Sequence, residues 1–249
     1  MTKPLRMEEM TWPEIRSAID DGFTTVVVGV GSTEQHGPHL PTMTDARIAD
    51  DLCLRVARTL GNALQARTID IGVSEHHLAF GGTVSLRPQT LHMVLLDVVH
   101  SLARCGFERI VLLPTHGGNF DTVHRVVEQA GPDHPAVEVV GYTDLMAFSG
   151  FLNDLSAEFG VDAAASGAHA GESETSIMLA LEPDLVHSDR FESGYLGPVG
   201  EAEAKTVFEK GMKALTSNGV LGDPRTASAE KGRVYLERLA EMLAAAVAP

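Results

Sequence analysis

Acidic and histidine side chains follow an apolar run near the start of the chain. Residues 24–30 form a continuous run rich in β-branched residues, and Glu34 and His36 come soon after it. In extended backbone, alternate side chains point to the same side, so Glu34 and His36 can share one site. Asp45 stands at the expected start of a helix, where backbone N–H groups favour an anion. Thr44 or Asp45 could equally act only as the helix cap.

A further histidine, His116, follows a second buried strand and precedes two glycines. Glycine lets backbone approach a ligand closely, although an isolated histidine at a strand end is usually a packing residue. Together with Glu34, His36 and Asp45 it provides two imidazoles and two carboxylates. This mixture of donors suits Zn²⁺, Mn²⁺ or Fe²⁺. The four residues therefore predict a metal site.

The segment from His169 to Ser176 opens another helix and contains Glu172 and Glu174 in its first turn. One acid there is explained by the helix dipole alone, but the dipole does not explain His169. A histidine and an acid beside a metal-bound water are what proton transfer to a leaving amine requires. The pair His76 and His77 is weaker evidence, because neighbours on a strand face opposite ways, and we expect one of them to be structural.

Alternating strand and helix patterns place these residues. Apolar positions repeat every four residues from Asp45 to a helix end at Gly61. The expected fold is α/β, a three-layer α/β/α arrangement with a mostly parallel sheet, whose functional loops meet at the carboxyl ends of the strands. A short helix begins at a capping box on Thr11. We predict strands at 24–30, 66–73, 109–113 and 137–142. We predict helices at 45–60, 89–104, from about 120 to 130, at 228–246, and one that the segment 169–176 opens and that continues to 181.

Composition limits the possible functions. The 249 residues suit one domain, 1–249, and their net charge of −15 argues against nucleic-acid or membrane partners and for a small molecule or peptide. Residues 1–4 lead into charged residues rather than a signal-peptide core, so we expect a cytoplasmic protein. Cys53 and Cys105 are too few for a disulfide framework. The chain contains neither a P-loop motif nor G-x-S-x-G, and residues 29–34 lack the full dinucleotide-binding glycine pattern.

These motifs resemble the creatininase (creatinine amidohydrolase) family. The match is strongest at 31–41 with Asp45 and continues through 80–86, 116–119, 169–176, 219–224 and 230–232. The resemblance implies a hexamer whose subunits hold two divalent metal ions, Zn²⁺ first with Mn²⁺ or Fe²⁺ as alternatives, and a bridging water. It also implies that Glu34 and His116 bind one metal, that His36 binds the other, and that Asp45 bridges them. His169 resembles the histidine that handles the proton of the scissile nitrogen.

The chain departs from creatininase at two places. Creatininase has a metal-binding acid two residues after the histidine that matches His116, where this chain has Gly118. Glu172 is our preferred replacement, both as ligand and as catalytic acid, and Glu174 is the alternative. Creatininase covers its substrate with tryptophan, whereas the only one here is Trp12. We assign substrate contacts to Ser74, His76, Gly117, Gly118 and Asn119.

The expected activity is that of a metal-dependent amidohydrolase. It would hydrolyse a C–N bond, other than an ordinary peptide bond, in a cyclic amide, formamide or related compound through a metal-bridged water. The resemblance leaves three alternatives open: a mycofactocin-type precursor peptide peptidase, an inosose-type ring hydrolase, and a non-catalytic metal-binding protein of the same fold. We expect specificity to lie in a loop at 142–166 and in partner subunits.

Overall fold

A four-stranded parallel sheet forms the centre of the computed structural model, which describes residues 5–249. Its strand order is β2-β1-β3-β4. Every residue of β1 and β3 is buried, as expected for β-branched strands covered on both faces. Val26 of β1 stands in register with Leu64 of β2 and Ile110 of β3. The strands are β1 (Thr25–Val30), β2 (Ala63–Gln65), β3 (Arg109–Pro114) and β4 (Glu138–Gly141).

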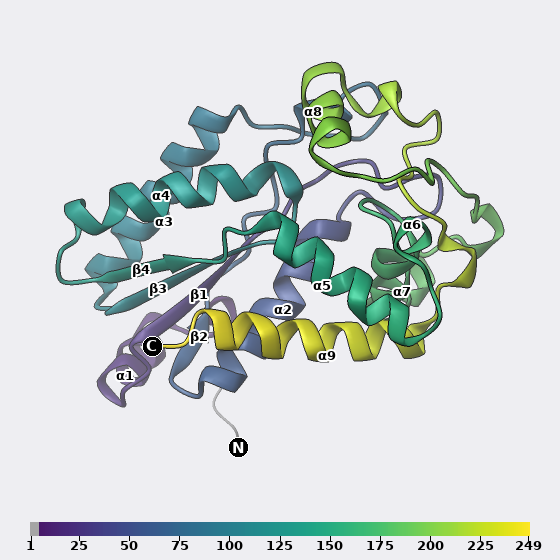
Figure 1. Cartoon of the computed structure of the whole chain (residues 1–249). Coiled ribbons are helices and arrows are strands. Elements are labelled where there is room, and N and C mark those ends of the chain that lie inside the picture. The colour runs from purple at the N-terminus through teal and green to yellow at the C-terminus, as the bar shows by residue number, and fades with distance from the viewer. Residues whose placement is uncertain (1–4) are drawn as a thin grey trace.

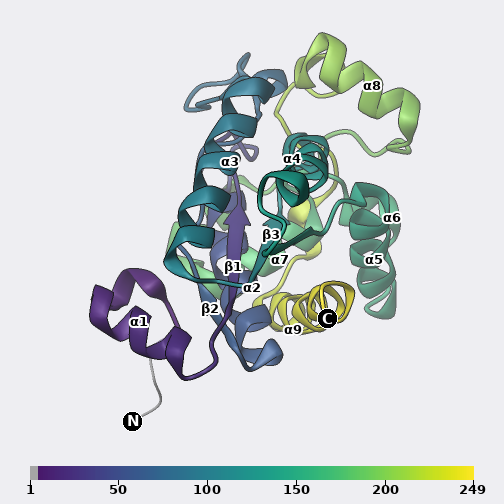
Figure 2. The same ribbon diagram turned by 90° about the vertical axis from the view of Figure 1, so that its left-hand side faces the viewer.

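Helices cover both faces of this sheet and give the three layers (Figure 1). Val26 and Val28 of β1 belong to the core shared with α1, α3 and α4, whereas Val27 points to the core shared with α2 and α9. Figure 2 shows α3 and α9 on different sides of the sheet. The helices are α1 (Trp12–Asp20), α2 (Thr44–Leu60), α3 (Pro88–Cys105), α4 (Phe120–Asp133), α5 (Leu145–Glu158), α6 (Ala163–Ser166), α7 (Glu172–Leu181), α8 (Glu201–Lys210) and α9 (Ala229–Ala246).

The ends of several helices lie where the sequence predicts them. The capping box at the start of α1 is present, with the Thr11 backbone N–H donating to Glu14 at 2.7 Å. Gly61 and Gly106 end α2 and α3 in the left-handed conformation, at φ 79° and 105°. The predicted strand and helix alternation is therefore confirmed over most of the described chain. The prediction for residues 1–4 lies outside the described residues.

Two predicted segments were wrong. The strand expected at 66–73 is β2, which lies earlier at Ala63–Gln65. Ala66 and Ile69 still donate to Val27 and Gly29 of β1, both at 2.9 Å, but the two residues between them interrupt the ladder. The loop expected at 142–166 contains α5 and α6. Asp144 caps α5 by accepting from the Ala147 N–H at 2.8 Å. Apolar residues of α5 at helical spacing pack into the core: Phe148, Leu152 and Leu155.

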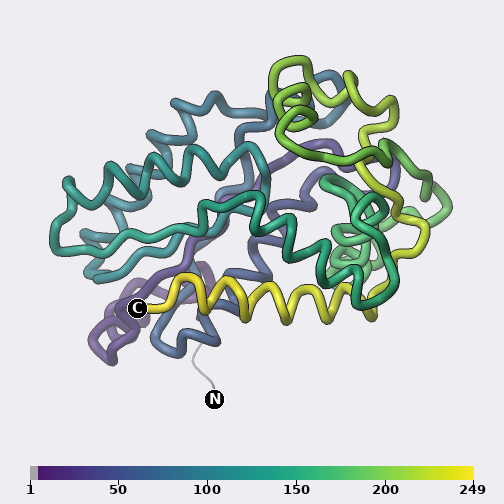
Figure 3. Tube along the Cα trace, viewed as in Figure 1, coloured from purple at the N-terminus to yellow at the C-terminus, as the bar shows by residue number. Residues whose placement is uncertain are grey.

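The chain between α7 and α9 crosses the carboxyl end of the sheet. Figure 3 shows the chain after α7 forming an arch, residues 190–225, before it reaches α9. In Figure 2 the tip of β1 points to the side where α8 lies. The arch thus roofs the edge of the sheet where the functional loops meet. Among the helices of residues 5–249, none is long and apolar enough to cross a membrane.

Candidate active site

Three loops and the first turn of α2 bring the predicted residues together at the carboxyl end of the sheet. Glu34 and His36 follow β1, and Asp45 lies in the first turn of α2. His116 follows β3, and His169 precedes α7. All five side chains are buried, with exposed fractions between 0% and 7%. The sequence therefore predicted correctly which loops converge.

Asp45 stands between two groups of potential metal ligands. One of its oxygens, Oδ2, lies 3.4 Å from His116 Nδ1, which is also 3.2 Å from Glu34 Oε1. Its other oxygen, Oδ1, lies 3.3 Å from His36 Nε2, and this nitrogen is 3.9 Å from Glu174 Oε2. In each group the ligand atoms lie within 4.8 Å of one another. Asp45 does not cap α2, whose N-cap is Met43.

Backbone carbonyls fix the orientation of the imidazoles in this cluster. A carbonyl can only accept, so His36 Nδ1 donates to Glu34 O at 3.1 Å, and His116 Nε2 donates to Val73 O at 2.9 Å. His169 Nε2 likewise donates to the Gln35 carbonyl at 2.8 Å. The other nitrogen of each ring therefore faces the carboxylates, where the neutral form of the ring would offer its lone pair to a metal ion. This is the arrangement in which a neutral imidazole binds a metal.

Unpaired polar atoms show that the site suits a cation. Glu34 Oε1, His36 Nε2 and Asp45 Oδ2 are buried and have no hydrogen-bond partner among the described residues. Buried polar atoms normally have partners, so their convergence calls for a positively charged ligand. Three carboxylates and imidazole nitrogens form a donor set that fits a divalent transition metal. The residues present therefore fit the metal site that the sequence predicts.

The electrostatics of the cluster lead to the same conclusion. Burial disfavours the charged form of His36, but the Asp45, Glu174 and Glu34 carboxylates outweigh burial and raise its pKa to about 10. Burial, with Asp45 and Glu34 adding to it, raises the pKa of Glu174 to about 7. The carboxylates thus draw positive charge onto a neighbouring group, and a metal ion can supply that charge in place of a proton.

His169 behaves differently from His36. Burial and the positive charge of His36 lower the pKa of His169 well below its ordinary value. Its Nδ1 lies 3.7 Å from Glu34 Oε1, and its ring centroid lies 4.2 Å from that of His36. His169 is therefore neutral near pH 7, with a free lone pair on the cluster side. This geometry is compatible with a proton acceptor and also with a third imidazole ligand.

Glu172 and Glu174 point to different surroundings. Residues two apart on a helix lie about 200° apart around its axis, so the two carboxylates cannot face the same site. Glu174 faces His36, whereas Glu172 is fully buried beneath α9 and bonds Lys231 Nζ at 3.1 Å and Tyr235 OH at 3.1 Å. Glu172 belongs to none of the ligand groups among the described residues. The placement therefore favours Glu174, the alternative, over the preferred Glu172.

The predicted substrate contacts separate into two sets. His76 and Gly117 line a cavity beside the cluster. Ser74, Gly118 and Asn119 do not line it. Asn119 is fully buried and uses its amide to accept from Val73 N at 2.9 Å and to donate to Gly31 O at 2.9 Å. The Asn119 amide thus joins its own loop after β3 to the loop after β1 and to the segment at Val73. Because these bonds occupy the amide, Asn119 does not reach the cavity.

Gly118 accounts for the missing acid of the creatininase pattern. A Cβ at this position would lie 2.1 Å from Val73 O and 2.8 Å from His116 Nε2. Any side chain would collide with the carbonyl that orients His116. The loop in this conformation therefore requires glycine, and an acid must come from another element.

Gln35 and His77 support the cluster through contacts that the sequence analysis did not predict. Gln35 Nε2 lies 2.9 Å from His77 Nδ1 and 3.2 Å from the carbonyl of Gly219, so its amide joins three loops. Since His77 Nδ1 accepts from this amide, its Nε2 carries the proton and lies 3.3 Å from Glu34 Oε1, without forming a hydrogen bond to it. Alternation along an extended segment was the available signal, because it turns Gln35 away from Glu34 and His36.

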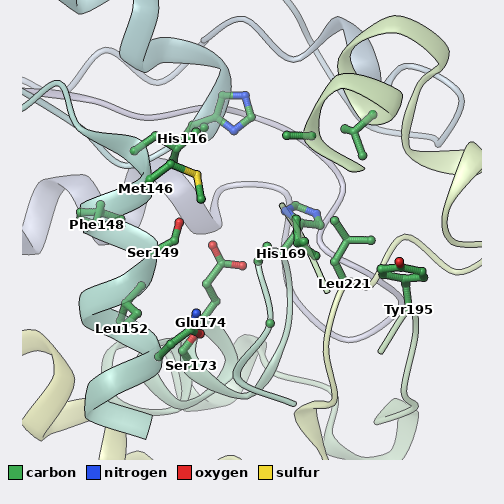
Figure 4. A pocket seen from close by; sticks show the side chains of 18 of the residues that line it. His116, Met146, Phe148, Ser149, Leu152, His169, Ser173, Glu174, Tyr195 and Leu221 are labelled. Carbon is green, nitrogen blue, oxygen red and sulfur yellow. The ribbon is translucent and has the colours of Figure 1, made fainter. Parts of the chain in front are cut away.

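A cavity of about 420 Å³ opens from the cluster. Figure 4 shows Glu174 between a wall from α5, with Ser149 and Leu152, and an opposite wall with His169 and Leu221. The volume lies in the range of small-molecule sites, roughly 300–1,000 Å³. The cluster therefore forms one end of a space large enough for a substrate.

Known proteins share this sequence and architecture. The creatininase family, described as creatinine amidohydrolase, matches residues 8–247. The chain belongs to the creatininase family. A mycofactocin precursor peptide peptidase of Mycobacterium ulcerans is 32% identical over 225 residues, covering 87% of this chain and 82% of that one. A creatinine amidohydrolase of Pseudomonas putida is 31% identical over 261 residues, covering 99% and 97%.

A crystal structure of a creatinine amidohydrolase has a TM-score of 0.82 to this structure, at 28% identity, and the match covers 99% and 97% of the two chains. It confirms the predicted α/β fold as that of the creatininase family. The matched relatives are named as hydrolases, and membership of the creatininase family makes this chain an enzyme of that class, a hydrolase of C–N bonds.

Proposed function

We propose that this chain is a two-metal amidohydrolase. Glu34, Asp45 and His116 would hold one divalent ion, and His36, Asp45 and Glu174 would hold the other. The observation that carries the proposal is the convergence of buried, unpaired ligand atoms on both sides of Asp45. Zn²⁺ is the proposed ion, with Mn²⁺ and Fe²⁺ as alternatives, because the donors are imidazole nitrogens and carboxylate oxygens.

The chemistry divides between the metal ions and the side chains. The two ions would supply Lewis acidity, which lowers the pKa of a bound water and polarises a carbonyl. His169 supplies proton transfer, since its neutral ring has a free Nδ1 on the cluster side and is held through Nε2 by the Gln35 carbonyl. His76 and Gly117 contact the substrate at the cavity wall. Glu172 keeps α7 and α9 together and takes no part in proton transfer.

Metal analysis tests the proposal. The purified protein, reconstituted with Zn²⁺ and dialysed, should retain two equivalents per chain, and Asp45→Ala should lose both because each ion shares that carboxylate. Asp121→Ala is the matched control: Asp121 also lies in the first turn of a helix, but it is exposed and pairs with Arg125. One equivalent or less in the unmodified protein, or equal metal content in the two variants, would refute the two-metal site.

The substrate class is a separate question. A cyclic amide, a formamide or a related compound is our first proposal, and a peptidase of the mycofactocin type is the main alternative because of the Mycobacterium relative. An inosose-type ring hydrolase remains the third. A hydrolysis screen of the metal-loaded protein with creatinine, lactams, formamides, short peptides and inososes distinguishes them. Cleavage of an inosose without turnover of any C–N substrate would overturn the amidohydrolase.

Assembly and location remain predictions. We propose a homohexamer in the cytoplasm, built from one domain per chain, and a small-molecule substrate. Light scattering of the purified protein should give about six times the chain mass of 26.6 kDa. A monomeric mass would contradict the hexamer.

A further inference from the structure

The cavity next to the metal-site cluster is apolar over most of its wall. Away from the cluster, its lining comes mainly from α5, from α6 and the residues after it, and from the arch between α7 and α9, which contains α8. The apolar side chains of this wall include Met146, Phe148, Leu152, Val207, Phe208 and Leu221. Covering the apolar surface of a cavity with an apolar group of the ligand is energetically favourable, because it removes both surfaces from water. The wall therefore has a chemistry of its own, distinct from that of the cluster.

No lysine or arginine lines this cavity within residues 5–249. All of its acidic lining residues belong to the metal-site cluster: Glu34, Asp45 and Glu174. Lys231 already pairs with Glu172 and donates to the Thr226 carbonyl. A carboxylate on the part of a substrate that lies against α5 and α8 would thus be buried without a counter-charge, which is costly.

The volume of the cavity and its exposure to solvent limit the class of substrate further. The volume of about 420 Å³ lies toward the lower end of the range for small-molecule sites, about 300–1,000 Å³, which suits a ligand of roughly a dozen non-hydrogen atoms. Met146 and Phe208 line the cavity and are 58% and 49% exposed. Phe208 also packs against His76, with ring centroids 4.7 Å apart. The apolar surface therefore continues from the interior to the surface of the protein.

We propose, resting on the metal-site function above, that the substrate presents its scissile C–N group to the cluster and carries an uncharged, apolar group against α5 and α8. The substrate has roughly a dozen non-hydrogen atoms and no carboxylate in this apolar part. A compact, polar substrate would instead leave the apolar wall from α5 and α8 uncovered.

A pair of hydroxamic acids tests the inference by binding rather than by turnover. Hydroxamates bind metal ions, so octanohydroxamate and suberic acid monohydroxamate present the same head group and the same eight-carbon chain. They differ in the carboxylate at the far end of the second. Titration calorimetry of the Zn²⁺-loaded protein should give at least tenfold tighter binding of octanohydroxamate than of the carboxylate analogue. It should also give at least tenfold tighter binding than acetohydroxamate, which lacks the apolar chain.

Two variants locate the effect on the α5 wall. Met146→Lys adds a cation at the exposed rim of the cavity and should reduce the preference for octanohydroxamate at least threefold. Ala147→Lys, at the next position, is exposed and does not line the cavity, so it should leave the preference unchanged.

The outcomes separate the two proposals. If none of the three hydroxamates binds, the metal site itself is refuted. If they bind with equal affinity, or the carboxylate analogue binds more tightly to the unmodified protein, the metal site stands and the apolar substrate class is overturned. Equal effects of the two lysine variants would also overturn the assignment to the α5 wall.

Discussion

Replacing each of the two acids at the start of α7 by glutamine should have opposite consequences. Glu172 is fully buried, and its carboxylate bonds Ser176 at 2.7 Å and Tyr235 and Lys231 at 3.1 Å each. Glu172→Gln leaves the Lys231 ammonium without a counter-charge. Breaking a buried ion pair from one side costs about 3–5 kcal/mol. Because Lys231 is 15% exposed and keeps the Thr226 carbonyl, we expect a loss of about 2–4 kcal/mol of unfolding free energy.

Glu174→Gln should leave the stability of the metal-free protein almost unchanged. Burial and repulsion from Asp45 and Glu34 outweigh the attraction of His36 and raise the pKa of Glu174 to about 7, so removing its charge costs little net stability. The metal content should fall from two equivalents to one, because the group formed with His36 and Asp45 loses a ligand.

Urea unfolding of metal-free protein and metal analysis of reconstituted protein measure the two effects separately. The expected pattern is a destabilised Glu172→Gln that still binds two ions and a stable Glu174→Gln that binds one. The reverse pattern, in which Glu172→Gln loses an ion and Glu174→Gln retains both, would refute the assignment of the ligand and restore the preference drawn from the sequence.

Three further changes test other parts of the site. His169→Ala should retain two metal ions and lose at least about a hundredfold in turnover, as for a proton-transfer group, and loss of an ion would make His169 a ligand. Burial lowers the pKa of His39 to about 4, so unfolding takes up a proton between pH 6.5 and pH 4. The free energy of unfolding should therefore be highest above pH 6.5 and fall by up to about 1.4 kcal/mol per pH unit toward pH 4. Urea unfolding of His39→Gln should show a weaker dependence on pH. Gly118→Ala should cost about 1–3 kcal/mol or more because its Cβ meets the Val73 carbonyl, whereas Gly131→Ala in open space should be neutral or stabilising by up to about 1 kcal/mol; equal effects would contradict the required glycine.

The sequence predicts the sheet and the loops well because their signals are local. Buried β-branched runs specify β1 and β3, and the spacing of Glu34 and His36 brings both into the cluster. The run at 66–73 misplaces β2, since an apolar segment alone does not show where it enters the ladder with its neighbour. Helix α5 was missed although Phe148, Leu152 and Leu155 have helical spacing.

The choice between Glu172 and Glu174 could not be made from the sequence. Both lie in the first turn of one helix, where either carboxylate complements the dipole equally. The decision depends on how α7 is rotated about its axis, and that rotation is set by packing against α9, where Gly232 approaches the Ser176 carbonyl. His76 and His77 pose the same problem, because a 3₁₀ turn from Glu75 to His77, rather than a strand, carries them.

The backbone carbonyls that orient the three imidazoles bear on how such an enzyme can diversify. These carbonyls belong to Glu34, Gln35 and Val73, so the orientation of the rings is built into the course of the main chain. Substitutions in α5 and α8 change the cavity wall without touching those bonds. The cavity wall can therefore change while the cluster stays the same, in keeping with the different substrates in the names of the matched relatives.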